Sequence, residues 1–74
     1  MWTLDDNAPH HTLTRAITRR TCYQLQLRPE GWLLLRLDYD QDRARLAEVK
    51  GFEATPTTDE VTVCALADDW IDMT

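Results

Sequence analysis

The sequence predicts a small single α+β domain, in which an antiparallel β-hairpin over residues 22–39 is flanked by short helices. Two observations lead to this fold class. Residues 23–28 alternate apolar with polar side chains and are followed by a Pro-Glu-Gly turn and a second apolar stretch over 32–39, the pattern of two strands joined by a tight turn. The segments on both sides of the hairpin place apolar residues at helical spacing.

The register of the hairpin is expected to follow from its turn. Proline presets the first central φ of a type I turn, and the glycine can take a left-handed conformation that closes a β-bulge. With this bulge Leu25 faces Leu35, and one face of the hairpin becomes apolar. The residues predicted on that buried face are Tyr23, Leu25, Leu27, Leu33, Leu35 and Leu37. Without the bulge Tyr23 would face Arg36, so that the buried face would contain a charged side chain.

Helices are expected at residues 10–20 and 41–50, each with an alternative. The first segment has apolar residues at helical spacing, but its threonines favour an extension of the first hairpin strand. The second has good helix formers between a capping Asp40 and a terminating Gly51. Its alternative is a third strand over residues 44–53, which would make the protein a β-meander with one helix.

A third helix is expected at residues 58–71. A capping box from Thr57 to Glu60 precedes an apolar stripe with the spacing of one helix face, Val63, Leu66, Ala67, Trp70 and Ile71. The β-branched residues at 61–64 leave a strand open as the alternative. Residues 1–8 have no period and are expected to form a loose arm of the domain 1–74, unless Trp2 and Leu4 join an edge strand.

Length and composition bound the chemistry. A chain of 74 residues with 43% hydrophobic content can fold, but its core is too small to hold a deep substrate pocket. The first residues show neither a basic start nor an apolar run, so no secretory signal or membrane span is expected and the protein is predicted to be cytoplasmic. In that compartment Cys22 and Cys64 are expected to be small buried hydrophobic residues rather than a disulfide.

Charge is distributed unevenly along the chain. The formal net charge of −5 divides into +2 for residues 1–37 and −7 for residues 38–74. A block of one sign is usually only a solvated surface, but an acidic block can also meet a basic partner.

The spacing of the candidate residues does not match known motifs for metal binding or catalysis. The pair His10-His11 points in two directions on any regular element, and the acidic run from Asp38 lacks the glycine and the closing glutamate of a calcium loop. The carboxylates Asp68-Asp69 have no nucleophile near them in the sequence, and serine is absent. We therefore expect no enzyme activity, no metal and no cofactor. The few arginines of this acidic chain do not predict direct nucleic-acid binding.

Surface recognition is the function that these exclusions leave. An apolar anchor within a charged rim is typical of an interface, and grouped aspartates would attract a basic partner. The candidate partner-binding residues are Trp32, Asp38, Asp42, Asp68, Asp69 and Asp72. For Trp32 the alternative is a place in the core.

In size, charge and its helix-flanked hairpin, the chain resembles small acidic phage-type inhibitor proteins, anti-CRISPR proteins among them. The resemblance covers no motif, so no residue role is carried over. It implies a protein that blocks a larger nucleic-acid-handling complex with a basic surface. An immunity protein or antitoxin, and a small structural subunit or homodimer paired through an exposed hairpin edge, are the alternative classes.

Overall fold

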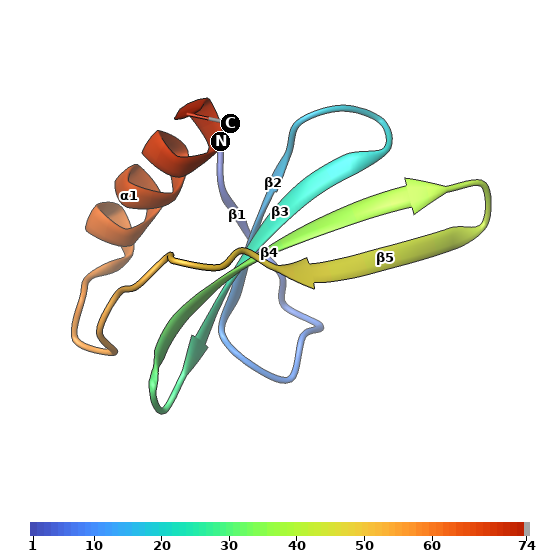
Figure 1. The fold of residues 1–74 in the computed structure, drawn as a ribbon. Coiled ribbons are helices and arrows are strands. Elements are labelled where there is room, and N and C mark those ends of the chain that lie inside the picture. Colours follow the sequence, from blue (N-terminus) through green and yellow to red (C-terminus); the bar gives the residue numbers. More distant parts are fainter. Residues whose placement is uncertain (74) are drawn as a thin grey trace.

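The computed structural model describes residues 1–73 and shows an antiparallel sheet followed by a helix (Figure 1). The elements are β1 (Thr3–Leu4), β2 (Thr12–Ala16), β3 (Thr21–Arg28), β4 (Gly31–Asp40), β5 (Arg43–Glu48) and α1 (Glu60–Met73). The sheet has 5 strands in the order β1-β2-β3-β4-β5, so each strand pairs with its neighbours in the chain. The expected α+β class is therefore confirmed, but as the alternative, a β-meander with one helix.

The helices expected at residues 10–20 and 41–50 are wrong. The first segment contains β2, where the β-branched Thr12 and Thr14 pair with glutamines of β3. The second contains β5, where Leu46 pairs with Leu37 of β4. Helix propensity is a weak local preference, and backbone pairing with an existing long hairpin overrides it at both ends.

The register of the β3–β4 hairpin also differs from the expected one. Leu25 pairs with Leu34 and Leu27 pairs with Trp32, so Leu25 and Leu35 lie on opposite faces of the sheet. Three of the six residues predicted on one buried face, Leu33, Leu35 and Leu37, lie on the other face. β4 is apolar on both faces, and alternation along such a strand does not determine which face points inward.

The turn of this hairpin contains two residues and no bulge, because Arg28 pairs directly with Gly31. Gly31 has a φ of 143°, and a Cβ built on it would lie 2.5 Å from the carbonyl oxygen of Ala54. The same oxygen accepts a hydrogen bond of 2.9 Å from the backbone N–H of Trp32. Glycine is needed here for the close approach of the 52–55 segment to the start of β4, rather than for a bulge.

α1 confirms the helix expected at residues 58–71 and covers one face of the sheet. Val63 and Ala67, both 0% exposed, cluster with side chains from β2, β3 and β4 and with Phe52, the core anchor of the connection. The expected cap at Thr57 is wrong. Asp59 caps the helix instead, because its Oδ1 accepts a hydrogen bond of 3.1 Å from the backbone N–H of Thr62.

The N-terminal residues contain the edge strand that was the alternative to a loose arm. Thr3 and Leu4 of β1 pair with Thr14 and Leu13 of β2. The indole N–H of Trp2 donates a hydrogen bond of 2.8 Å to Asp68 of α1. The start of the chain is thus tied both to the sheet and to the helix.

Candidate functional site

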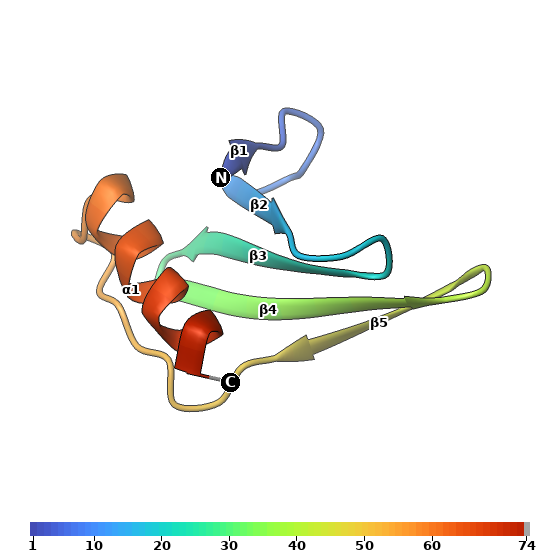
Figure 2. The ribbon, with the colours of Figure 1, turned by 90° about the horizontal axis from the view of Figure 1, so that it is seen from above.

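The acidic half of the chain is divided by the fold into two separate groups. Figures 1 and 2 place α1 and the β4–β5 turn at opposite ends of the molecule. Asp38 and Asp42 belong to the turn end, whereas Asp68, Asp69 and Asp72 belong to α1. The two sets of candidate residues therefore do not form one surface.

Aspartates at the β4–β5 turn lie among arginines. Asp38 pairs with Arg45 across the strands and Asp40 pairs with Arg43. Arg36 donates from Nε to Asp38 at 3.0 Å. Since the positive charges stand directly opposite the negative ones, this end of the molecule presents no acidic surface.

Asp38 also accepts a hydrogen bond from the neighbouring strand β3. The hydroxyl of Thr21 donates a hydrogen bond of 2.8 Å to its Oδ1. This hydrogen bond, followed by that from Arg36, holds the pKa of Asp38 below its usual value. Its charge serves contacts within the sheet.

The other end of the molecule contains the carboxylates that follow Lys50 in the sequence. Residues 51–73 contain six carboxylates and no lysine or arginine, and we call these carboxylates the acidic end: Glu53, Asp59, Glu60, Asp68, Asp69 and Asp72. Three of them bond within the molecule: Asp59 caps α1, Glu60 lies 2.7 Å from Nε2 of His11, and Asp68 accepts from Arg15 at 2.6 Å. Within the described residues, Glu53, Asp69 and Asp72 are exposed and have no side-chain partner.

The aspartates near the end of α1 oppose the local preferences of the helix. The C-terminal end of a helix carries partial negative charge, and the last turn of α1 contains no basic residue. Asp68 and Asp72 are four positions apart, a spacing at which like charges repel each other. Aspartate is also a weak helix former. Asp68 is compensated by its contacts with Arg15 and Trp2, whereas Asp69 and Asp72 have no such partner among the described residues.

A groove borders the acidic end. It has a volume of about 600 Å³ and lies between the start of β4, the connection that follows β5, and α1. Its apolar lining is Trp32, Leu33, Phe52, Ala54 and Leu66, and its two carboxylates are Glu30 and Glu53. Since all of its charged lining residues are acidic, it suits an apolar side chain that is carried next to a lysine or arginine.

Trp32 lies in the core rather than on the surface, which was the alternative to its role as an exposed anchor. Its side chain is 4% exposed, and its indole N–H donates a hydrogen bond of 3.0 Å to the carbonyl of Thr58. Its ring also meets His11 edge-on at 5.9 Å. Trp32 therefore forms part of the groove floor, while Leu66, which is 40% exposed, offers the more accessible apolar surface there.

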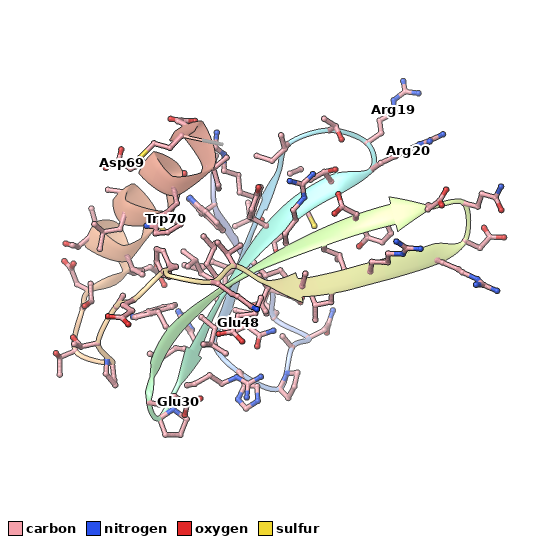
Figure 3. The ribbon with its side chains drawn as sticks, viewed as in Figure 1. Arg19, Arg20, Glu30, Glu48, Asp69 and Trp70 are labelled. Carbon is pink, nitrogen blue, oxygen red and sulfur yellow. The ribbon has the colours of Figure 1, made fainter. Side chains whose placement is uncertain are left out.

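Trp70 packs over the connection rather than standing free. Its ring meets Phe52 edge-on at 6.3 Å, and its outer edge covers Gly51. The side chain remains 36% exposed beside Asp69 (Figure 3). An aromatic ring next to free carboxylates is thus present on the accessible side of α1.

The remaining chemical groups form no further site in residues 1–73. No cluster of His, Cys, Asp and Glu side chains within these residues has the geometry to hold a metal ion. Cys22 and Cys64 are free thiols, and burial, aided by nearby carboxylates, raises the pKa of both. Within the same residues, no helix combines the length and apolar character of a membrane span.

Comparison with protein-family models, curated proteins and solved structures finds no match for this chain. The fold and the surface define it as a small α+β domain, a five-stranded antiparallel meander followed by one helix, with an acidic end.

Asp69 and Asp72, which were predicted from the sequence, lie exposed on α1, whereas the groove residues Glu30, Glu53 and Leu66 were not among the predicted residues. The absence of basic residues after Lys50 was visible in the sequence and would have pointed to Glu53. Glu30 and Leu66 are 36 positions apart and line the same groove only because of the path of the connection, for which the sequence contains no signal.

Proposed function

We propose that this chain is a non-catalytic protein-binding module that uses its acidic end to bind a basic protein surface. In this proposal it acts as an inhibitor, because its carboxylates occupy the place where a nucleic-acid-handling protein would hold phosphates. The observation that carries the proposal is the set of unpartnered carboxylates on α1 and the preceding connection, some of them held at a cost to the helix.

The arrangement supports this mode of binding in two ways. Exposed carboxylates on α1 and on the connection before it attract a basic surface over a distance of about 10 Å at moderate salt and speed encounter. The neighbouring groove then offers apolar contact, which is less sensitive to salt and fixes orientation. Lysine and arginine of the partner would meet Glu53, Asp69 and Asp72, and an apolar side chain would enter beside Leu66.

A capture experiment with matched variants tests the proposal. The full chain is immobilised and exposed to lysate of the source cells. It is compared with Glu53→Gln/Asp69→Asn/Asp72→Asn and with the control Asp6→Asn/Asp40→Asn/Asp42→Asn. Both variants lose three negative charges, but the control loses them away from the acidic end. The partner is identified by mass spectrometry and purified.

We expect the partner to bind the first variant about tenfold more weakly, since three exposed ion pairs contribute about 0.2–1 kcal/mol each. The control variant should bind like the original chain. Binding should weaken as salt rises from about 0.05 to about 0.3 M. Added chain should also displace a labelled oligonucleotide from the partner. A partner that binds both variants equally, or that keeps its nucleic acid in the presence of the chain, would contradict the proposal.

A further inference from the structure

The sheet has a second apolar face that α1 does not cover. We call it the helix-free face. It consists of the side chains on the side of the sheet opposite to Leu25 and Leu34, which face α1. In β3 to β5 these are Cys22, Gln24, Gln26, Arg28, Leu33, Leu35, Leu37, Tyr39, Ala44, Leu46 and Glu48. Cys22 and Leu35 are buried, yet neither belongs to the core cluster that α1 completes. Leu46 is 56% and Tyr39 is 45% exposed.

The sequence of β4 is that of a strand covered on both sides. Residues 32–35 are continuously apolar, and Leu37 continues the series. A near-continuous apolar run is typical of strands with a layer packed on each face, whereas a strand with one wet face alternates. Within residues 1–73 the core cluster formed with α1 includes Trp32 and Leu34 but not Leu33, Leu35 or Leu37.

The charge of the helix-free face indicates what kind of partner fits it. The chain has 21 charged residues, yet Arg28 and Glu48 are the only Lys, Arg, Asp or Glu among the paired positions of this face in β2 to β5. The row Ala16, Cys22, Leu37 and Leu46 crosses four strands without a polar side chain. Such a face complements another neutral apolar face, and a second copy of the chain provides one.

Net charge does not oppose this pairing. α1 and its carboxylates lie on the other face of the sheet, so two copies in contact through their helix-free faces keep both acidic ends outside. The acidic end described above remains free in each copy.

The size of the face sets how much surface such a contact could bury. Four strands spaced by about 4.8 Å and about six residues long form a face of roughly 20 by 20 Å before the pleat and side chains are counted. A standard interface buries about 800 Å² per partner, which is roughly 15% of the 5482 Å² accessible surface of the chain. The flat face, of roughly 400 Å², is about half of that area, and the relief of its side chains adds to it.

We propose that two copies of the chain pack sheet against sheet through their helix-free faces. Leu37 and Leu46 of each copy would form the centre of the interface above the already buried Leu35, with the sheets about 10 Å apart, as in a β-sandwich. The exposed Tyr39 would be covered at its margin. This arrangement differs from strand pairing along the open edge of β5.

The mass of the full chain in solution tests the proposal, by sedimentation equilibrium over a range of concentrations. The original chain should have twice its monomer mass of 8.6 kDa. Leu46→Lys and Tyr39→Lys each place a charge in the proposed interface at an exposed position and should give the monomer mass. Val61→Lys is the matched control, since Val61 is 79% exposed on α1, and it should remain a dimer.

Three outcomes overturn the proposal. The first is a monomer for the original chain at about 100 μM, because an interface of standard size binds more tightly than this. The second is a dimer that survives Leu46→Lys. The third is loss of the dimer in Leu46→Lys but not in Tyr39→Lys, which would assign the contact to the β5 edge. Circular dichroism of each variant is the control that checks whether the fold is retained.

Discussion

Arg36 lies opposite Tyr23 in the β3–β4 pair, with its guanidinium carbon 5.9 Å from the centre of the tyrosine ring. This is the pairing that the sequence argument rejected because it joins a core residue to a charged one. The arginine resolves the conflict by lying over the ring face, where its charge is attracted by the π electrons and remains in solvent. The tyrosine beneath it is 6% exposed.

The register of the hairpin predicts unequal costs for two adjacent leucines. Leu34, 1% exposed, contacts the core cluster under α1, whereas Leu33 lies on the opposite face at the groove. Leu34→Ala should cost about 2–5 kcal/mol of unfolding free energy, as for other truncated core leucines. Leu33→Ala should cost clearly less. Urea unfolding of both variants measures the difference, and equal midpoints would show that the register is wrong.

The β4–β5 turn predicts a stabilising substitution. Gln41 has a φ of 56°, the only positive φ of a non-glycine residue among residues 1–73. A side chain in this conformation costs roughly 1–2 kcal/mol, and the first central position of a type II′ turn favours glycine. Gln41→Gly should therefore raise the thermal unfolding midpoint, offset in part by the greater freedom of glycine in the unfolded chain. The control substitution Gln41→Ala keeps a Cβ at this exposed position and should not raise the unfolding midpoint.

The acidic end predicts a trade between stability and binding. Asp72→Asn removes a negative charge in the last turn of α1, where such a charge is unfavourable by about 0.3–1 kcal/mol at low salt, and Asp69→Asn removes one just before that turn, where the effect is smaller. Each variant should unfold at a higher temperature than the original chain while binding the partner more weakly. Asp6→Asn, which lies outside the helix, is the control for the change in net charge. A lower unfolding temperature for both helix variants would remove the argument that these aspartates are kept for function.

Acid should destabilise the fold through two carboxylates. The hydroxyl of Thr62, followed by its backbone N–H, lowers the pKa of Asp59, and Thr21 followed by Arg36 lowers that of Asp38. Because both folded pKa values lie below the unfolded value of about 3.9, the stability from these groups is present above that value and is lost as pH falls through the folded values.

Two asparagine variants test this pH dependence. Asp59→Asn keeps a capping side chain but has no titrating group, and Asp38→Asn likewise removes the charge that Arg36 and Thr21 meet. Thermal unfolding of each variant should depend less on pH below about 4 than that of the original chain. The same acid dependence in both variants and in the original chain would exclude these carboxylates as its source.

Several features of the fold were determined by the sequence itself. The position of the hairpin turn after Arg28, the strands on both sides of it, and the helix after residue 58 rest on local signals, namely turn residues, alternation and an i, i+3, i+4 stripe, whereas the bulge predicted in the turn was wrong. The same applies to the excess of carboxylates in the second half of the chain. Local signals suffice where one residue pattern fits one secondary structure.

Tertiary structure alone decided the rest, because the deciding energies arise between distant segments. β2 and β5 form where unpaired backbone groups of the central hairpin are available, and this outweighs the helix preference of residues 41–50. The inward face of β4 is set by α1, which reaches it only after a turn of the chain through residues 49–59. The same path separates Asp38 and Asp42 from the aspartates of α1 and places Glu30 and Leu66 in the lining of one groove, so this groove exists only in the folded molecule.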